Sequence, residues 1–311
     1  MKTTQDNRLV RFGAGAALSV LIALSTVTAH AAPPALDAKI IGDASGEKPT
    51  SSPDGVVKIN WARNDVKVTV DGMPLPPPAG LGSWAAFAPM ADGTAMVMGD
   101  TVVFEDEVDS AMDAAFANGL SVSALHNHFF YDTPKVYFMH IGGEGKPDAL
   151  AVGVKAVWGA IKNVRSAHPT PGSGFGGETP KPGHIDAEAV GKILGQKATD
   201  MNGVVKVTIN RDGTMHDMPV SGSMGLTTWA AFSGSDALSA IDGDFIMTAD
   251  EVQPVLHALR KGGIHIVALH SHMTGEKPSF YFTHFWCKGK TEDLAHGFRA
   301  ALDAQAAVKK S

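Results

Sequence analysis

The sequence predicts an α+β fold built from two tandem pseudo-symmetric repeats, each an antiparallel sheet with packed helices. Three observations lead to this prediction. An internal repeat runs through the chain, short segments alternate apolar and polar residues, and longer segments carry helix start and stop signals. With 311 residues, of which 44% are hydrophobic and 19% charged, the chain has the balance of a globular protein and the length for two domains.

The repeat is visible in matching blocks of sequence. "GSWAAF" at Gly82 recurs as "TTWAAF" at Thr227, and "ALHNH" recurs as "ALHSH" at an offset of 144 residues. Upstream the offset drifts to 148, which changes in loop length explain. Proline and glycine dominate the segment between the copies, as in linkers. The expected parts are a signal peptide at 1–31, a first repeat at 36–165, a linker at 166–184 and a second repeat at 185–306.

The N-terminus has the pattern of an export signal. Lys2, Arg8 and Arg11 precede an apolar stretch at 13–27, and "AHA" ending at Ala31 is typical of a cleavage site. The alternative is an uncleaved anchor, but the stretch is shorter than the roughly 20 apolar residues that span a bilayer. We therefore expect a periplasmic or secreted protein with no stable membrane anchor after signal cleavage.

Charge and cysteine content exclude some classes of protein. The net charge of -6 and the lack of a basic run argue against a nucleic-acid partner. Cys287 is the single cysteine, so no disulfide can form within one chain, and no cysteine stands at the cleavage site to carry a lipid.

Within the first copy the elements follow in order. Residues 56–60 and 66–70 alternate like strands around a turn, and 83–89 and 94–99 predict two further strands. Residues 105–119 predict a helix with acids in its first turn and a stop at Gly119. A hairpin of 121–128 with 135–141 and a closing helix at 148–164 complete the unit; the second copy has the matching helices at 248–263 and 292–307.

A histidine pattern recurs in the predicted hairpin of both copies. Both follow H-x-H-x3-[D/E]-x-P-x5-H-x4-G. Because side chains alternate along a strand, the first two histidines point to the same face, and the returning strand brings the third beside them. Three converging imidazoles are a set that holds a metal ion. The residues are His126, His128, Asp132, Pro134, His140 and Gly145 in the first copy, and His270, His272, Glu276, Pro278, His284 and Gly289 in the second.

These residues receive specific expected roles. The six histidines are the candidate ligands of a divalent metal, zinc first, with copper, iron, nickel or manganese as alternatives. Asp132 and Glu276 are the candidate catalytic carboxylates, although a carboxylate at this position can also be a ligand or orient one. The competing interpretation is structural: histidines that hydrogen-bond the backbone across the repeat interface.

Other residues attract a functional interpretation and are set aside. Met96 and Met98 suggest copper, but the second copy has Ala240 and Asp242 at those positions, which favours packing. The tryptophans of the matched "WAAF" strands are expected in the core, and Cys287 is expected to be a buried free thiol.

The sequence resembles a bacterial family, the LppY/LpqO-like proteins, a domain of unknown function. The blocks "GVVKI", "LGSWAAF", "VMGDTVVFEDEV" and "VSALHNHFFYDTPKVYFMHIGGEG" carry the resemblance, which covers nearly the whole chain after the signal. It implies an exported bacterial protein and no particular activity. A weaker resemblance is to cupins, whose first motif is similar to His270, His272 and Glu276; the early third histidine and the preceding helix imply a similar ligand arrangement on another fold.

Two functions fit these observations. In a metal-dependent hydrolase, the metal lowers the pKa of a water molecule and Asp132 or Glu276 transfers the proton. In a non-catalytic protein, the same sites bind a metal or an envelope ligand. The expected partner is a small molecule or a cell-envelope component.

Overall fold

A computed structural model describes residues 34–308. The predicted signal peptide therefore lies outside the described residues. Among the described helices, none combines the length and apolar character that crossing a bilayer requires.

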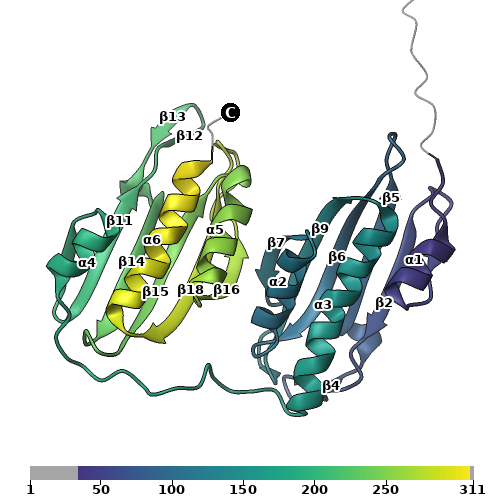
Figure 1. The fold of residues 1–311 in the computed structure, drawn as a ribbon, viewed down its shortest axis with the longest axis horizontal. Coiled ribbons are helices and arrows are strands. Elements are labelled where there is room, and N and C mark those ends of the chain that lie inside the picture. Colours follow the sequence, from purple (N-terminus) through teal and green to yellow (C-terminus); the bar gives the residue numbers. More distant parts are fainter. Residues whose placement is uncertain (1–33, 309–311) are drawn as a thin grey trace, which may run out of the picture. The chain divides into compact units, whose positions relative to one another are not determined.

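The two repeats have the same order of elements (Figure 1). In the first repeat these are α1 (Ala38–Ser45), β1 (Thr50–Ser51), β2 (Val57–Ala62), β3 (Val68–Val70), β4 (Met73–Leu75), β5 (Gly82–Pro89), β6 (Ala95–Phe104), α2 (Val108–Ala117), β7 (Ser121–His126), β8 (Asp132–Thr133), β9 (Val136–Gly145) and α3 (Pro147–Ala167). In the second they are α4 (Ala187–Leu194), β10 (Ala198–Asp200), β11 (Val204–Asn210), β12 (Gly213–Met215), β13 (Met218–Val220), β14 (Thr227–Gly234), β15 (Ser239–Met247), α5 (Ala249–Lys261), β16 (His265–His270), β17 (Glu276–Lys277), β18 (Tyr281–Gly289) and α6 (Thr291–Ala307).

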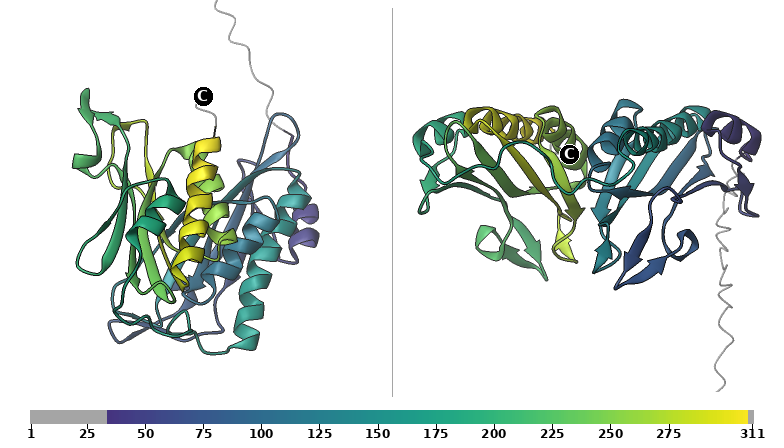
Figure 2. Two further views of the ribbon diagram at one scale, coloured as in Figure 1. Left: turned by 60° about the vertical axis from the view of Figure 1, so that its left-hand side comes forward. Right: turned by 90° about the horizontal axis from the view of Figure 1, so that it is seen from below.

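Twelve strands form one antiparallel sheet in the order β1-β2-β5-β6-β9-β7-β16-β18-β15-β14-β11-β10. The first six strands come from the first repeat and the last six from the second, which confirms the predicted α+β fold with tandem repeats. The helices cover one face of the sheet, and the small sheets β4-β3-β8 and β13-β12-β17 lie on its other side (Figure 2). None of the α-helices within residues 34–308 covers that second face, which we call the open face.

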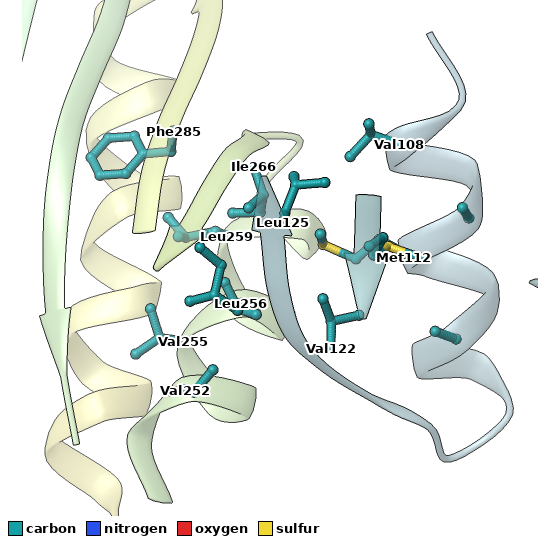
Figure 3. Close-up of a cluster of buried hydrophobic side chains, with 14 of the residues drawn as sticks. Val108, Met112, Val122, Leu125, Val252, Val255, Leu256, Leu259, Ile266 and Phe285 are labelled. Carbon is teal, nitrogen blue, oxygen red and sulfur yellow. The ribbon is translucent and has the colours of Figure 1, made fainter. Parts of the chain in front are cut away.

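The repeats meet where β7 pairs with β16 through Leu125 and Leu269. Both leucines are buried on the helix side of the sheet, in a cluster that includes Val122, Met112 and Leu256 (Figure 3). Burying each such side chain contributes about 1.5–3 kcal/mol to folding. The two repeats thus share one continuous hydrophobic core.

A glutamate at the start of the helix before each histidine strand is bound by arginine, and in α5 it also caps the helix. Helix α5 begins with a capping box, in which the Glu251 carboxylate accepts a hydrogen bond from the Thr248 backbone N–H at 2.9 Å. Glu251 also binds Arg211 at 2.9 Å. In the first repeat Glu107 is fully buried and binds Arg63 at 2.8 Å and Arg165 at 2.7 Å. Glu107 and Glu251 occupy the same position in the two repeats, 144 residues apart, and each binds arginine, which gives their recurrence a structural reason.

Several local expectations need correction. Residues 66–70 do not pair with 56–60; β3 belongs to the small sheet with β4 and β8. Trp84 and Trp229 are half-buried on the open face rather than in the core, and Lys58 and Lys206 lie over their rings. Cys287 is also only half-buried.

Candidate metal centre

Alternation along the central strands places the histidines on the open face. Leu125 and Leu269 point into the core, so the next residues, His126 and His270, point the opposite way. His140 on β9 pairs with Ala124 on β7, which is two residues before His126 and therefore on the same face of the sheet. The second copy repeats this arrangement, and His128 and His272 lie two residues beyond the last residues of β7 and β16. We call His126, His128 and His140 the first histidine site, and His270, His272 and His284 the second.

The second histidine site brings one nitrogen of each ring within 4.8 Å of the other two. The ring of His270 lies 5.1 Å from those of His272 and His284, measured between centroids. His272 is held in place because its ring stacks on the buried Phe282 at 3.5 Å. His284 Nδ1 lies 3.1 Å from the Gly243 carbonyl oxygen, and an Nδ1–H that donates there leaves Nε2 free to bind a metal.

The first histidine site has the same design. His126 lies 5.1 Å from both His128 and His140, measured between ring centroids. His128 stacks on Phe138 at 3.3 Å, as its counterpart stacks on Phe282. Across the described part of the chain, however, only the second site has three ligand atoms, one from each residue, that all lie within 4.8 Å of one another. The ring nitrogens of the first site are therefore spaced more widely than those of the second.

Each site also contains an aspartate that the sequence analysis did not assign to it. Asp244 on β15 pairs directly with His284, and Asp100 on β6 pairs directly with His140. Asp244 Oδ2 lies 3.5 Å from His272 Nε2, and Asp100 Oδ1 lies 3.9 Å from His140 Nε2. The signal was present in the sequence, because "MGD" and "DGD" end at these two aspartates at the same offset as the histidines.

Burial sets the charge states of several residues in the two histidine sites. Removal from water raises the pKa of Asp244 to about 6 and lowers the pKa of His272 to about 4. Burial likewise lowers the pKa of His270 and of His128. These imidazoles are therefore neutral at pH 7, which is the form that binds metal ions.

The two predicted catalytic carboxylates bind the backbone of their own loops. Asp132 Oδ2 accepts a hydrogen bond from the Val136 N–H at 2.7 Å, and its Oδ1 lies 3.1 Å from Lys135 Nζ. Glu276 Oε1 accepts from the Phe280 N–H at 2.9 Å. Both side chains are buried, and Glu276 Oε2 has no hydrogen-bond partner within residues 34–308. These contacts fix the loop that follows the second histidine; a catalytic role for either acid stays a prediction.

The donor set of the second histidine site fits a divalent metal. Nitrogens around a tetrahedral zinc lie about 3.4 Å apart, so three groups already within 4.8 Å of one another need only a small contraction. Asp244 Oδ1 is buried without a hydrogen-bond partner among the described residues, as is Asp100 Oδ1. A buried carboxylate oxygen left unpaired is costly, and a bound cation would satisfy it.

Comparisons with known proteins give one informative match. None of the curated proteins matches the sequence. Among solved structures, EtuB from Clostridium kluyveri is 10% identical with a TM-score of 0.21, over 83% of this chain and 90% of EtuB. A trimeric bacterial microcompartment shell protein, PduB, is 10% identical with a TM-score of 0.20, over 82% of this chain and 89% of PduB. Similarity at this level supports no inference.

The family comparison covers both repeats. Residues 39–160 and, separately, 188–304 match the family described as Domain of Unknown Function (DUF1259). These segments span most of the chain and contain both histidine sites. The chain belongs to this family and carries its domain in two copies.

Proposed function

We propose that the protein binds a divalent metal ion at each histidine site and acts as a metal-dependent hydrolase. The observation that supports this most directly is the second site, where three imidazoles converge within 4.8 Å beside a buried aspartate oxygen that lacks a partner. Zinc suits this set of nitrogen and oxygen donors best; copper, iron, nickel and manganese are the other candidates.

The residues of the second site divide the chemical work. His270, His272 and His284 hold the metal, which supplies Lewis acidity and a water molecule of lowered pKa. Asp244 is the carboxylate closest to these histidines, at 3.5 Å from His272, and is therefore better placed to accept a proton than Glu276, which binds the backbone. The first site uses Asp100 in the same way.

A carrier without turnover is the second candidate, and the position of Asp244 favours it. If Asp244 completes a shell of four ligands, no coordination position remains for water, as in structural zinc sites. Enzyme and carrier then differ in one property, which is an exchangeable water at the metal. Paramagnetic relaxation of solvent water by a Mn²⁺- or Cu²⁺-loaded sample distinguishes them.

We also infer that the protein is exported and related to the LppY/LpqO-like bacterial proteins. The basic, apolar and small-residue pattern of residues 1–31 supports export to the periplasm or the medium. The blocks around "GSWAAF" and "ALHNH" support the relationship, and both lie inside the family match.

Elemental analysis of the purified protein tests the metal proposal. We expect about two equivalents for the wild type, and one for His126→Ala or His270→Ala. His296→Ala is the control, because His296 is exposed on α6, and the helices cover the face of the sheet opposite the histidine sites. A wild type that stays metal-free after exposure to zinc, copper, iron, nickel and manganese would reject both the hydrolase and the metal carrier.

A further inference from the structure

An open cavity of about 650 Å³ lies against the second histidine site on the open face of the sheet. His284 contributes to its lining, so the cavity reaches the proposed metal. The other lining residues that matter here are Trp229, Trp286, Phe175 and Asp242. The cavity thus joins the candidate metal centre to three aromatic side chains and a carboxylate.

Strand register explains how aromatic and acidic side chains alternate over this surface. Trp229 pairs with Asp244, and Asp244 pairs with His284. In the neighbouring row, Asp242 pairs with Trp286. Because residues two apart on a strand share a face, both rows point into the open side.

Two lysines contact groups at this cavity, and the inter-repeat segment contributes Phe175 to its lining. The Nζ atom of Lys206 lies 4.1 Å from the ring centroid of Trp229. Phe175, from the segment between the repeats, is 47% exposed, and its ring stacks on His265 at 4.0 Å. The Lys288 ammonium donates a hydrogen bond to the Gly176 carbonyl and ties this segment to β18.

The chemistry of the lining selects among ligand classes. An apolar ligand would cover Asp242 without giving it a hydrogen bond, which costs about 1–3 kcal/mol. An organic anion would lie beside both Asp242 and Asp244, and an organic cation would lie beside Lys206 and the proposed metal. A neutral ring with an apolar face and hydroxyl groups at its edge satisfies the aromatic rings, the carboxylate and the ammonium together.

We propose that this cavity binds a carbohydrate ring, which stacks on Trp286 and Phe175 and donates hydroxyl hydrogen bonds to Asp242. This inference rests on the proposed function in one respect, which is that the bound sugar is the substrate of the adjoining metal site. The binding itself needs no metal. The first repeat keeps Trp84 with Lys58 over its ring at 4.6 Å, but it has Met98 and Gly142 where the second has Asp242 and Trp286. The sugar site therefore belongs to the second repeat.

A glycan array of neutral mono- and disaccharides, probed with the full chain, tests the proposal. Isothermal titration calorimetry then measures the strongest sugar against wild type, Trp286→Ala, Trp286→Phe and Asp242→Asn. We expect at least tenfold weaker binding for Trp286→Ala and Asp242→Asn, and a smaller loss for Trp286→Phe, which keeps an aromatic face. Met98→Ala, the matched change in the first repeat, should bind as the wild type does.

Three results would overturn the proposal: no glycan binds, Trp286→Ala and Asp242→Asn bind sugar as well as wild type, or benzoate binds in place of any sugar. Each titration is run on zinc-loaded and on chelator-treated protein, with metal content measured on the same samples. Sugar binding by protein that takes up no metal would retain this inference and reject the proposed hydrolase. Metal uptake without sugar binding would reject this inference and retain the proposed metal site.

Discussion

Asp244 and His284 face each other as directly paired residues of β15 and β18, with Asp244 Oδ1 3.9 Å from His284 Nδ1. At this distance the aspartate does not hydrogen-bond the imidazole, and its Oδ1 is buried without a partner among residues 34–308. The strand pairing therefore holds an acid at the histidines at a cost to folding. Such a cost is typical of functional sites.

Asp244→Asn should stabilise the metal-free protein at pH 8 and weaken its metal affinity. Burial raises the folded-state pKa of Asp244 to about 6, above the unfolded value of about 3.9. Its contribution to stability is therefore fully present below about pH 4 and is lost as the pH rises through about 6. Urea unfolding of metal-free samples at pH 5 and pH 8 measures this: the wild type should lose more stability between the two than Asp244→Asn. An equal loss of stability in both proteins would contradict the raised pKa of Asp244.

Asp132→Asn and Glu276→Gln should lower stability but leave the metal content unchanged. The carboxylates accept hydrogen bonds from the Val136 and Phe280 backbone N–H groups, and weakening such charge-assisted bonds costs about 1–2 kcal/mol. Thermal unfolding and elemental analysis of the two variants provide the measurements. Loss of one metal equivalent from either variant would instead place its carboxylate among the ligands.

Glu107→Gln should destabilise the protein more than Glu251→Gln. Glu107 is fully buried between Arg63 and Arg165, so its substitution removes the charged acceptor that both guanidinium groups share and should cost about 1.5–3 kcal/mol, even though Asp65 and Asp106 remain as their other partners. Glu251 binds the more exposed Arg211, and water can replace part of that interaction. Urea midpoints for the two variants compare these costs directly, and a larger shift for Glu251→Gln would show that burial of Glu107 does not set its contribution.

Signal cleavage should leave Ala32 as the first residue of the exported protein. The small residues at Ala29 and Ala31 fit the positions that a signal peptidase reads. N-terminal sequencing of protein recovered from the periplasm or the medium checks the site. A full-length chain retained in the membrane fraction would support the uncleaved anchor instead.

Much of the fold was predictable because its signals are local. The alternation in "SVSALHNH" and "KVYFMHI" fixed a hairpin with the histidines on one face, and the structure places them there. The capping box at Thr248 and Glu251 was also readable from two residues three positions apart. Such patterns depend only on neighbours along the chain.

The aspartates of the sites were not predicted because they depend on strand order. Asp100 and Asp244 lie on strands that are distant in sequence and become neighbours of the histidines only through the β6–β9 and β15–β18 pairings. Asp132 is close to His128 in sequence, and this proximity made it the more obvious candidate. The chain turns after His128 and directs that carboxylate to the Val136 backbone instead.

The pairing of Leu125 with Leu269 has a consequence for the symmetry of the chain. These leucines occupy the same position in their respective repeats, since they are 144 residues apart, the offset of the histidine motifs. Equivalent residues that face each other define a local two-fold axis, which is the signature of an isologous homodimer interface. The protein therefore has, within a single chain, the organisation of a symmetric dimer.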